Sequence, residues 1–309
     1  MVGNRTGDET TLAAIREADS LADLHGLIGV NSDHDAYLRA KEEWEAAKRR
    51  QQATQGRSDG IPGRCVVVDG TEFHVHGVTH AGTPQERTFL RDHVSRFLER
   101  GATVYCEQGI RQMYFSDFSG VCEMDDYRWA MNECSELDGE SPLDDIPGMD
   151  FGSLREDVTS VASEFQAAVF SLIESGSEVY GERFERALGD VAAGFLMNHG
   201  DLAIADDFES YVLSREASTN PEKLDELQRY YHRTFLPQPL EREWLRRHDP
   251  KLELVSHARN ERMADYVVYH NEDAEEVHLI VGAAHQPGVV YYLERYREGR
   301  ELPPEFELF

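Results

Sequence analysis

Residues 64–106, RCVVVDGTEFHVHGVTHAGTPQERTFLRDHVSRFLERGATVYC, decide the fold of this chain. The stretch opens with an apolar, strand-like run over 65–68. A second strand-like run over 71–77, in which Phe73 and Val75 alternate with polar residues, follows the pair Asp69-Gly70. An Asp-Gly pair between two such runs is a strong signal for a two-residue turn. The sequence therefore predicts a β-hairpin here.

A helix follows the hairpin in the same stretch. Thr83 can cap its N-terminus and Pro84 suits the first helical position, so that the helix begins at residue 84 and runs to about Arg100. Residues 102–106 are apolar again and predict the next strand. Strand, helix and strand in this order indicate a parallel βαβ crossover.

The rest of the chain extends this α/β pattern. Residues 277–281 predict a buried strand, and apolar residues at helical spacing predict helices elsewhere. We expect these helices at 154–174, 178–198, 206–217, 221–234, 239–248, 259–270 and 288–297. The expected fold is α/β, with a mixed, mainly parallel central sheet, flanking helices and a helical middle region.

Changes in composition suggest how the chain is divided. Residues 1–57 are expected to form a helical N-terminal appendage, 58–63 a linker, and 64–309 an α/β domain that contains a helical block at about 151–250. The polar segment 111–150 is interpreted as a long insertion near the site, of the kind that serves as a lid. Residues 304–309 are a candidate edge strand.

The chain is strongly acidic. Fifty-nine acidic residues oppose 31 basic ones, which gives a net charge of -28, and the acids are spread along the whole sequence. This distribution favours a halophilic protein, in which molar salt screens the repulsion between the acidic groups. The alternative is a mesophilic acidic protein that binds a basic partner, but a binding tail would concentrate the acids in one segment. The net negative charge argues against nucleic-acid binding. No apolar run approaches the length of about 18 residues that a membrane-spanning helix needs, so we expect no membrane span and a cytoplasmic protein. An oligomer is compatible with this composition.

Two Gly-x-x-His motifs are the main candidates for chemistry. Gly77–His80 (GVTH) and Gly282–His285 (GAAH) each follow an apolar strand and precede a helix. Such turns lie at the carboxyl edge of an α/β sheet, where ligands usually bind. We interpret the glycines as residues that allow a tight or left-handed turn. The two histidines are therefore expected to meet at one metal ion or one water molecule.

Glu107 ends the strand at 102–106 and supplies a carboxylate to the same edge. Two histidines and one carboxylate suit a divalent metal ion with open positions, which lowers the pKa of bound water. Without a metal ion, the same groups can perform general acid–base catalysis. The metal-ligand prediction is His80, Glu107 and His285.

The other histidines have structural interpretations. His74 and His76 share one strand face, and the H-x-H spacing is found among metal ligands, but both are interpreted as structural or surface residues. No role is assigned to the histidines that stand singly, which are His199, His232, His248, His257, His270 and His278.

Four segments together resemble a known family. They are Gly77–His80, Glu107–Gly109, Arg259–Met263 (RNERM) and Val281–Gly288 (VGAAHQPG). In order and approximate spacing they are similar to the TraB/PrgY pheromone-shutdown family, which is related to the Tiki, GumN and erythromycin-esterase-like proteins. The resemblance covers about residues 64–297. The membrane-spanning segments of many TraB relatives have no counterpart here.

The resemblance implies a site and an activity. His80 and His285 would be metal ligands or water activators, and Glu107 a ligand or base. Arg259 would bind a carboxylate or stabilise an oxyanion, and Asn260 would orient a neighbouring group or add a hydrogen-bond donor. The implied metal is Mn²⁺, Co²⁺ or Zn²⁺.

The leading hypothesis is a hydrolase of the TraB/Tiki-like type that cleaves a peptide or ester bond, with metal-assisted activation of water. The alternative is a non-enzymatic module that binds a small molecule or peptide in the same cleft. A third possibility is an interaction protein whose histidines only close turns.

Overall fold

The computed structural model describes residues 3–52, 60–139, 168–174, 188–189, 203–271 and 274–303. A five-stranded sheet with the order β1-β2-β5-β3-β4 lies at the centre of these residues. Its strands are β1 (Arg64–Val68), β2 (Thr71–Val78), β3 (Thr103–Cys106), β4 (Val121–Glu123) and β5 (Glu276–Gly282). Only the β1–β2 pair is antiparallel, so the predicted mixed, mainly parallel α/β sheet is confirmed.

The hairpin and the first crossover form as the sequence predicts. Asp69 and Gly70 have φ angles of 50° and 98° and connect β1 to β2, as a two-residue hairpin turn requires. Helix α4 (Pro84–Glu99) begins with Pro84 in its first turn, and the Thr83 side chain accepts a hydrogen bond from Glu86 N. Strands β2 and β3 both run parallel to β5, which lies between them.

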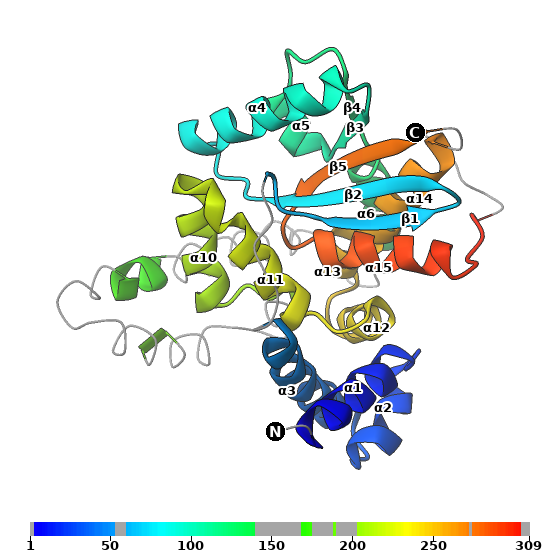
Figure 1. Cartoon of the computed structure of the whole chain (residues 1–309). Coiled ribbons are helices and arrows are strands. Elements are labelled where there is room, and N and C mark those ends of the chain that lie inside the picture. Colours follow the sequence, from blue (N-terminus) through cyan, green and yellow to red (C-terminus); the bar gives the residue numbers. More distant parts are fainter. Residues whose placement is uncertain are drawn as a thin grey trace, which may run out of the picture.

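Helices cover both faces of the sheet (Figure 1). Helices α14 (Arg259–His270) and α15 (Gln286–Arg297) share an apolar cluster with Phe73, Val75 and Leu279. On the opposite face, α4 and α5 (Gln108–Tyr114) pack against Val104 and Ile280. Burial of apolar surface on both faces is the main contribution to the stability of such a layered fold.

The N-terminal segment is helical, with α1 (Gly3–Arg16), α2 (Leu21–Ile28) and α3 (Asp33–Gln52). These helices share an apolar cluster with α12 (Gln238–His248). Within this interface, the buried Lys41 ammonium lies 3.1 Å from Glu241 Oε1, and Tyr37 donates a hydrogen bond to Glu241 Oε2. The segment therefore packs on the middle helices.

The middle helices occur where the sequence predicts them, within the described residues. They are α10 (Phe208–Thr219), the short turn Pro221–Lys223, α11 (Leu224–Thr234), α12 and α13 (Pro250–Glu253). Residues 168–174 and 188–189 are helical, and the remainder of the helices predicted at 154–174 and 178–198 lies outside the described residues. The candidate edge strand at 304–309 also lies outside them.

The described part of the segment 111–150, which the sequence predicts as a long insertion near the site, contains a strand and a helix. Residues 121–123 form β4 at the edge of the sheet, and α6 (Tyr127–Gly139) packs against the π-helical turn Leu254–Ala258. Three strand residues between turns give too short an apolar pattern to detect. Residues 140–150 of this segment lie outside the described part. None of the described helices has the length and apolar character to cross a lipid bilayer.

Candidate active site

The two Gly-x-x-His turns lie side by side. Val78 and Gly282 are paired residues at the ends of the neighbouring parallel strands β2 and β5, and Ala283 N donates a hydrogen bond to Val78 O over 2.9 Å. His80 and His285 follow these strand ends and therefore reach the same carboxyl edge of the sheet. The two motifs therefore lie together at this edge of the sheet.

The glycines allow the two turns to approach each other by leaving space. Of the two predicted backbone roles, the left-handed turn was wrong, whereas a tight turn does form at Gly282, whose carbonyl oxygen accepts a hydrogen bond from His285 N over 2.8 Å. Neither Gly77 nor Gly282 has a positive φ angle. A Cβ atom on Gly77 would lie 2.9 Å from Ala283 Cα, and one on Gly282 would lie 2.8 Å from His80 Nε2 and 3.3 Å from a carbon of the His285 ring. Only glycine lets the two turns and both rings approach this closely.

Glu107 lies between the two histidines. Its Oε2 atom is 3.8 Å from His80 Nε2, and its Oε1 atom is 3.9 Å from His285 Nε2. Gly282 N donates a hydrogen bond to Oε2 over 2.8 Å, and Arg259 Nη2 lies 2.6 Å from Oε1. Four of the five predicted site residues are therefore in one cluster around a carboxylate that is only 3% exposed.

Charge compensation keeps the buried Glu107 ionised. Burial, the largest single influence, opposes ionisation, but the two histidines and Arg259 together lower the pKa of Glu107 to about 2. Burial, again the first cause, lowers the pKa of His285 to about 4, against the opposing influence of Glu107. Because His285 is therefore neutral near pH 7, Arg259 is the main cation that balances Glu107 at that pH.

Asp126 also pairs with Arg259, and the sequence reasoning missed it. Arg259 Nε donates to Asp126 Oδ2, while Asp126 Oδ1 is buried with no hydrogen-bond partner among the described residues. Burial raises the pKa of Asp126 to about 7, although Arg259 opposes this shift. Arg259 therefore pairs with two buried carboxylates, those of Glu107 and Asp126.

Asn260 fixes the orientation of His285. Asn260 Oδ1 accepts a hydrogen bond from His285 Nδ1 over 2.8 Å, and Asn260 Nδ2 donates to Gln238 Oε1 over 3.1 Å. The proton on His285 is therefore on Nδ1, and its Nε2 lone pair is free. Gly288 leaves room for this amide, because a Cβ atom there would clash with Asn260 Nδ2. Gln238 was not predicted as a site residue.

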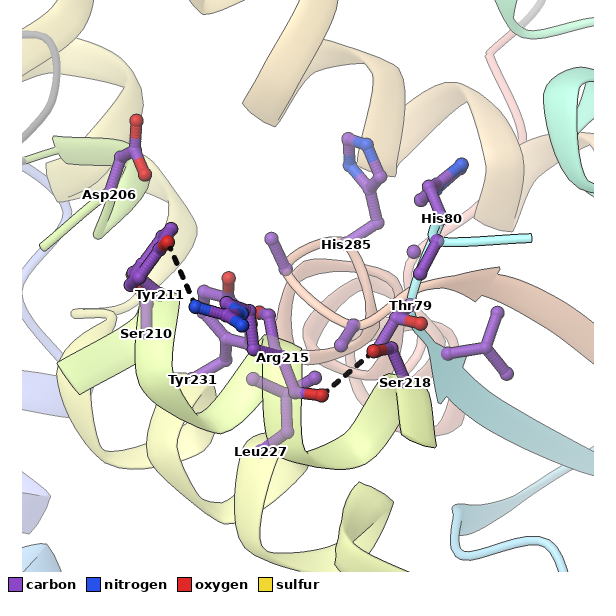
Figure 2. A pocket seen from close by; sticks show the side chains of 16 residues that line it. Thr79, His80, Asp206, Ser210, Tyr211, Arg215, Ser218, Leu227, Tyr231 and His285 are labelled. Atoms are coloured by element: carbon purple, nitrogen blue, oxygen red, sulfur yellow. Dashed lines mark hydrogen bonds between the residues drawn. The ribbon is translucent and has the colours of Figure 1, made fainter. Parts of the chain in front are cut away.

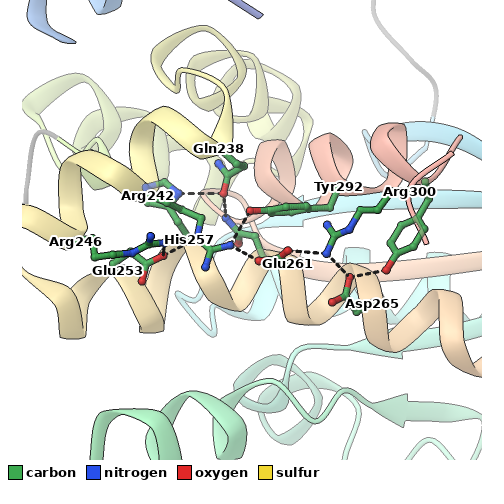
Figure 3. Close-up of polar contacts among 11 residues, drawn as sticks. Gln238, Arg242, Arg246, Glu253, His257, Glu261, Asp265, Tyr292 and Arg300 are labelled. Atoms are coloured by element: carbon green, nitrogen blue, oxygen red, sulfur yellow. Dashed lines mark hydrogen bonds and ion pairs between the residues drawn. The ribbon is translucent and has the colours of Figure 1, made fainter. Parts of the chain in front are cut away.

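A polar network holds α14, which carries Arg259 and Asn260, against its neighbours (Figure 3). Arg242 on α12 donates hydrogen bonds to Glu261 on α14 and to Tyr292 on α15. The π-helical turn Leu254–Ala258 directly precedes α14. Such turns are frequent at functional sites, and this one brings the two residues to the sheet edge.

Glu86 fixes the turn that carries His80. Its Oε1 atom accepts a hydrogen bond from Thr79 N over 2.9 Å, and Tyr114 OH donates to its Oε2 atom. Its carboxylate is fully buried against the first Gly-x-x-His turn and stabilises the position of that turn.

Two cavities flank the cluster. His80 and His285 line a cavity of about 390 Å³ whose opposite wall belongs to α10 and α11 (Figure 2). That wall is rich in hydroxyl groups, from Ser210, Tyr211, Ser214, Ser218 and Tyr231. Glu107 and Arg259 line a second cavity of about 610 Å³ beside α5 and α6. Both histidines are therefore accessible to a small molecule or a peptide side chain.

The predicted metal ligands are not arranged as a ready metal site. Among the described residues, the one group of three His, Cys, Asp or Glu side chains with ligand atoms within 4.8 Å of one another is Cys65, Glu72 and His74. In addition, both oxygens of Glu107 already accept hydrogen bonds or ion pairs from Arg259 and Gly282.

Comparisons of this chain with models of known protein families, with curated proteins and with solved structures find no match. The relation to the TraB/PrgY family therefore remains a resemblance carried by the four motifs alone.

Proposed function

We propose that this chain is a hydrolase that cleaves an ester or peptide bond by general acid–base catalysis at His285 and His80. One observation carries the proposal. His285 is neutral, its Nδ1–H is held by Asn260, and its free Nε2 atom faces Glu107 beside a cavity of about 390 Å³. A fixed, neutral imidazole with a free Nε2 atom is the group that general-base catalysis needs.

In the proposed reaction, His285 Nε2 removes a proton from a water molecule in the cavity. The water oxygen forms a bond to the carbonyl carbon of the substrate, and the bond from this carbon to the leaving oxygen or nitrogen then breaks. His80, whose side chain is 45% exposed, donates a proton to the leaving group. Proton exchange with solvent restores both imidazoles, and the net reaction consumes one water molecule.

Glu107 and Arg259 act as positioning residues in this proposal. The Glu107 carboxylate lies at nearly equal distances from the two imidazoles. It stabilises the positive charge that develops on His285 as this residue accepts a proton, and the positive charge that His80 carries before it donates one. Arg259 holds this carboxylate in place. The ordered motifs that resemble the TraB/PrgY family contain these same residues and support their membership of one site, although the resemblance gives Glu107 the role of a ligand or base.

A divalent metal ion fits this geometry poorly. The ligand atoms of His80, Glu107 and His285 do not all lie within 4.8 Å of one another, and Arg259 already balances the carboxylate charge. We therefore derive the reaction without a metal ion. The predicted role of Mn²⁺, Co²⁺ or Zn²⁺ can be tested by measuring metal content and activity after dialysis against a chelator. If activity is lost and one of these ions restores it, the reaction requires a metal ion.

The test of the hydrolase proposal is a panel of chromogenic esters and short peptides, incubated with the wild-type protein and His285→Ala at high salt. We expect turnover by the wild type and loss of turnover in the variant. His270→Ala is the matched control, since His270 is exposed at the far end of α14. If the wild type binds panel members but cleaves none, the non-enzymatic binding module replaces the hydrolase.

A further inference from the structure

A second group of chemically reactive side chains lies at the opposite end of the same strands. Cys65 on β1 is paired with His74 on β2, and Glu72 is two residues before His74. Because side chains alternate along a strand, all three project from the same face of the sheet. One ligand atom from each residue lies within 4.8 Å of the corresponding atoms of the other two.

The neighbouring strand β5 supports this group. His278 is paired with His74, and Glu276 is paired with Glu72, so β5 adds an imidazole and a carboxylate to the same face. The rings of His74 and His278 stack with their centroids 4.8 Å apart. Glu276 Oε1 lies 4.0 Å from His74 Nε2, which makes it a further candidate ligand.

His278 is itself held firmly. Its Nε2 atom is 2.9 Å from Glu276 Oε1, and its Nδ1 atom is 2.8 Å from His76 Nε2. Its ring stacks on Phe97 of α4. The interpretation of His278 as an isolated histidine in a polar context was therefore wrong, since only 3% of it is exposed. His74 stacks on a ring that cannot easily move, so its imidazole is pre-oriented toward Cys65 and Glu72.

We propose that Cys65, Glu72 and His74 form a binding site for a divalent transition-metal ion of the Zn²⁺ type. Cys65 supplies a thiolate after its proton passes to solvent, His74 supplies an imidazole nitrogen, and Glu72 supplies a carboxylate oxygen. Glu276 or a water molecule completes a tetrahedral set. Sulfur and imidazole donors select Zn²⁺ or Co²⁺ over Mg²⁺ and Ca²⁺, which prefer oxygen ligands.

The location gives this site a role separate from the proposed hydrolysis. The ligands are near the start of β2, whereas His80 follows the end of that strand. Strand β1 is an edge strand of the sheet, and a metal ion held by Cys65 and His74 would cross-link it to β2. Cys65 and Glu72 are exposed, so an ion from solvent can reach them. The site therefore does not depend on the hydrolase proposal.

Titration of the metal-free, reduced full-length chain with Co²⁺ tests the site, because a thiolate bound to Co²⁺ gives a near-ultraviolet charge-transfer band. We expect a band that saturates at one Co²⁺ per chain and that Zn²⁺ displaces. Cys65→Ser should abolish the band, and His74→Ala should weaken Co²⁺ binding at least about 10-fold. Cys122→Ser is the matched control, because Cys122 is also an exposed strand cysteine, on β4, and should keep the band.

Circular dichroism of Cys65→Ser should match that of the wild type, since the side chain is exposed. Two results would overturn the proposal: a wild-type chain with no charge-transfer band, or a band of unchanged strength in Cys65→Ser. Should His74→Ala fail to fold, Glu72→Gln provides the second ligand variant, and unchanged Co²⁺ affinity in that variant removes Glu72 from the site.

Discussion

Replacement of Gly282 by alanine perturbs the candidate active site with the smallest possible change. The new Cβ atom would lie 2.8 Å from His80 Nε2 and 3.3 Å from the His285 ring. The φ angle of Gly282 is not positive, so alanine is compatible with the backbone, and its N–H still donates to Glu107. The substitution therefore acts on the imidazoles and leaves the strand intact.

The size of the effect follows from these contacts. Ordinary contact begins near 3.4 Å, so the His80 ring must retreat by about 0.6 Å, and its 45% exposed side chain can do so toward solvent. We expect the free energy of unfolding to change by less than about 1 kcal/mol. A displacement of this size in a catalytic group should lower kcat/KM by roughly 10- to 100-fold.

The assay compares kcat/KM and denaturant unfolding for the wild type, Gly282→Ala and a control, Gly109→Ala. Gly109 is close to Glu107 and lines the second cavity, but a Cβ atom there meets nothing within 4 Å. The control should keep full activity. Full activity in a folded Gly282→Ala variant would refute the reasoning, as would an equal loss in both variants.

Three further predictions concern pH and salt. Asn260→Asp places a carboxylate beside His285 Nδ1–H, which favours the protonated imidazole. The acidic limb of the pH profile of kcat/KM, set near pH 4 in the wild type, should therefore move to a higher pH by about 1 to 3 units. An acidic limb at the same pH in the variant would contradict the role of Asn260. Burial raises the pKa of Asp265 in the folded protein to about 6, so the folded state retains this proton as pH rises from about 4 to 6 and the wild type loses stability over that window. Asp265→Asn has no carboxyl group to titrate and avoids this loss. Denaturant unfolding should therefore show that the free energy of unfolding of the variant, relative to that of the wild type, increases by roughly 3 kcal/mol between pH 4 and 7. A difference that stays constant with pH would contradict the raised pKa of Asp265. Because the chain carries a net charge of -28, raising KCl from about 0.1 M to 2 M should raise Tm by several degrees, and an unchanged or falling Tm would argue against the halophilic interpretation.

Local patterns predicted the parts of the fold that depend on neighbouring residues. The Asp69-Gly70 turn and the Thr83 cap each need only a few residues, and both form as expected. The placement of His80 and His285 at one edge also followed, because the carboxyl ends of parallel strands lie together.

Contacts between distant parts of the chain could not be predicted in the same way. The position of β5 between β2 and β3 depends on how three apolar strands are buried between two helical layers. Asp126 belongs to the site because it pairs with Arg259, and Gln238 because it accepts a hydrogen bond from Asn260. In each pair the two residues are more than 20 positions apart in the sequence. Nothing in the local sequence of either residue indicates such a partner.

Glycine motifs show a different limit. The sequence cannot tell a glycine that needs a positive φ angle from one that needs the absence of a side chain, and Gly77 and Gly282 are of the second kind. Likewise, the sequence predicts a buried strand at 277–281, but the stacking of His278 on His74 and Phe97 depends on residues of β2 and α4 that are far away in the sequence. The partner of His278, His76, belongs to another strand, 202 residues away.

A double-mutant cycle with His80→Ala and His285→Ala tests most directly whether the two Gly-x-x-His turns form one catalytic site. Residues that act as a unit have strongly non-additive effects on rate. We predict that each single variant loses at least about 100-fold in kcat/KM and that the double variant is little worse than either. Full activity in either single variant, or losses that simply multiply in the double variant, would contradict the account.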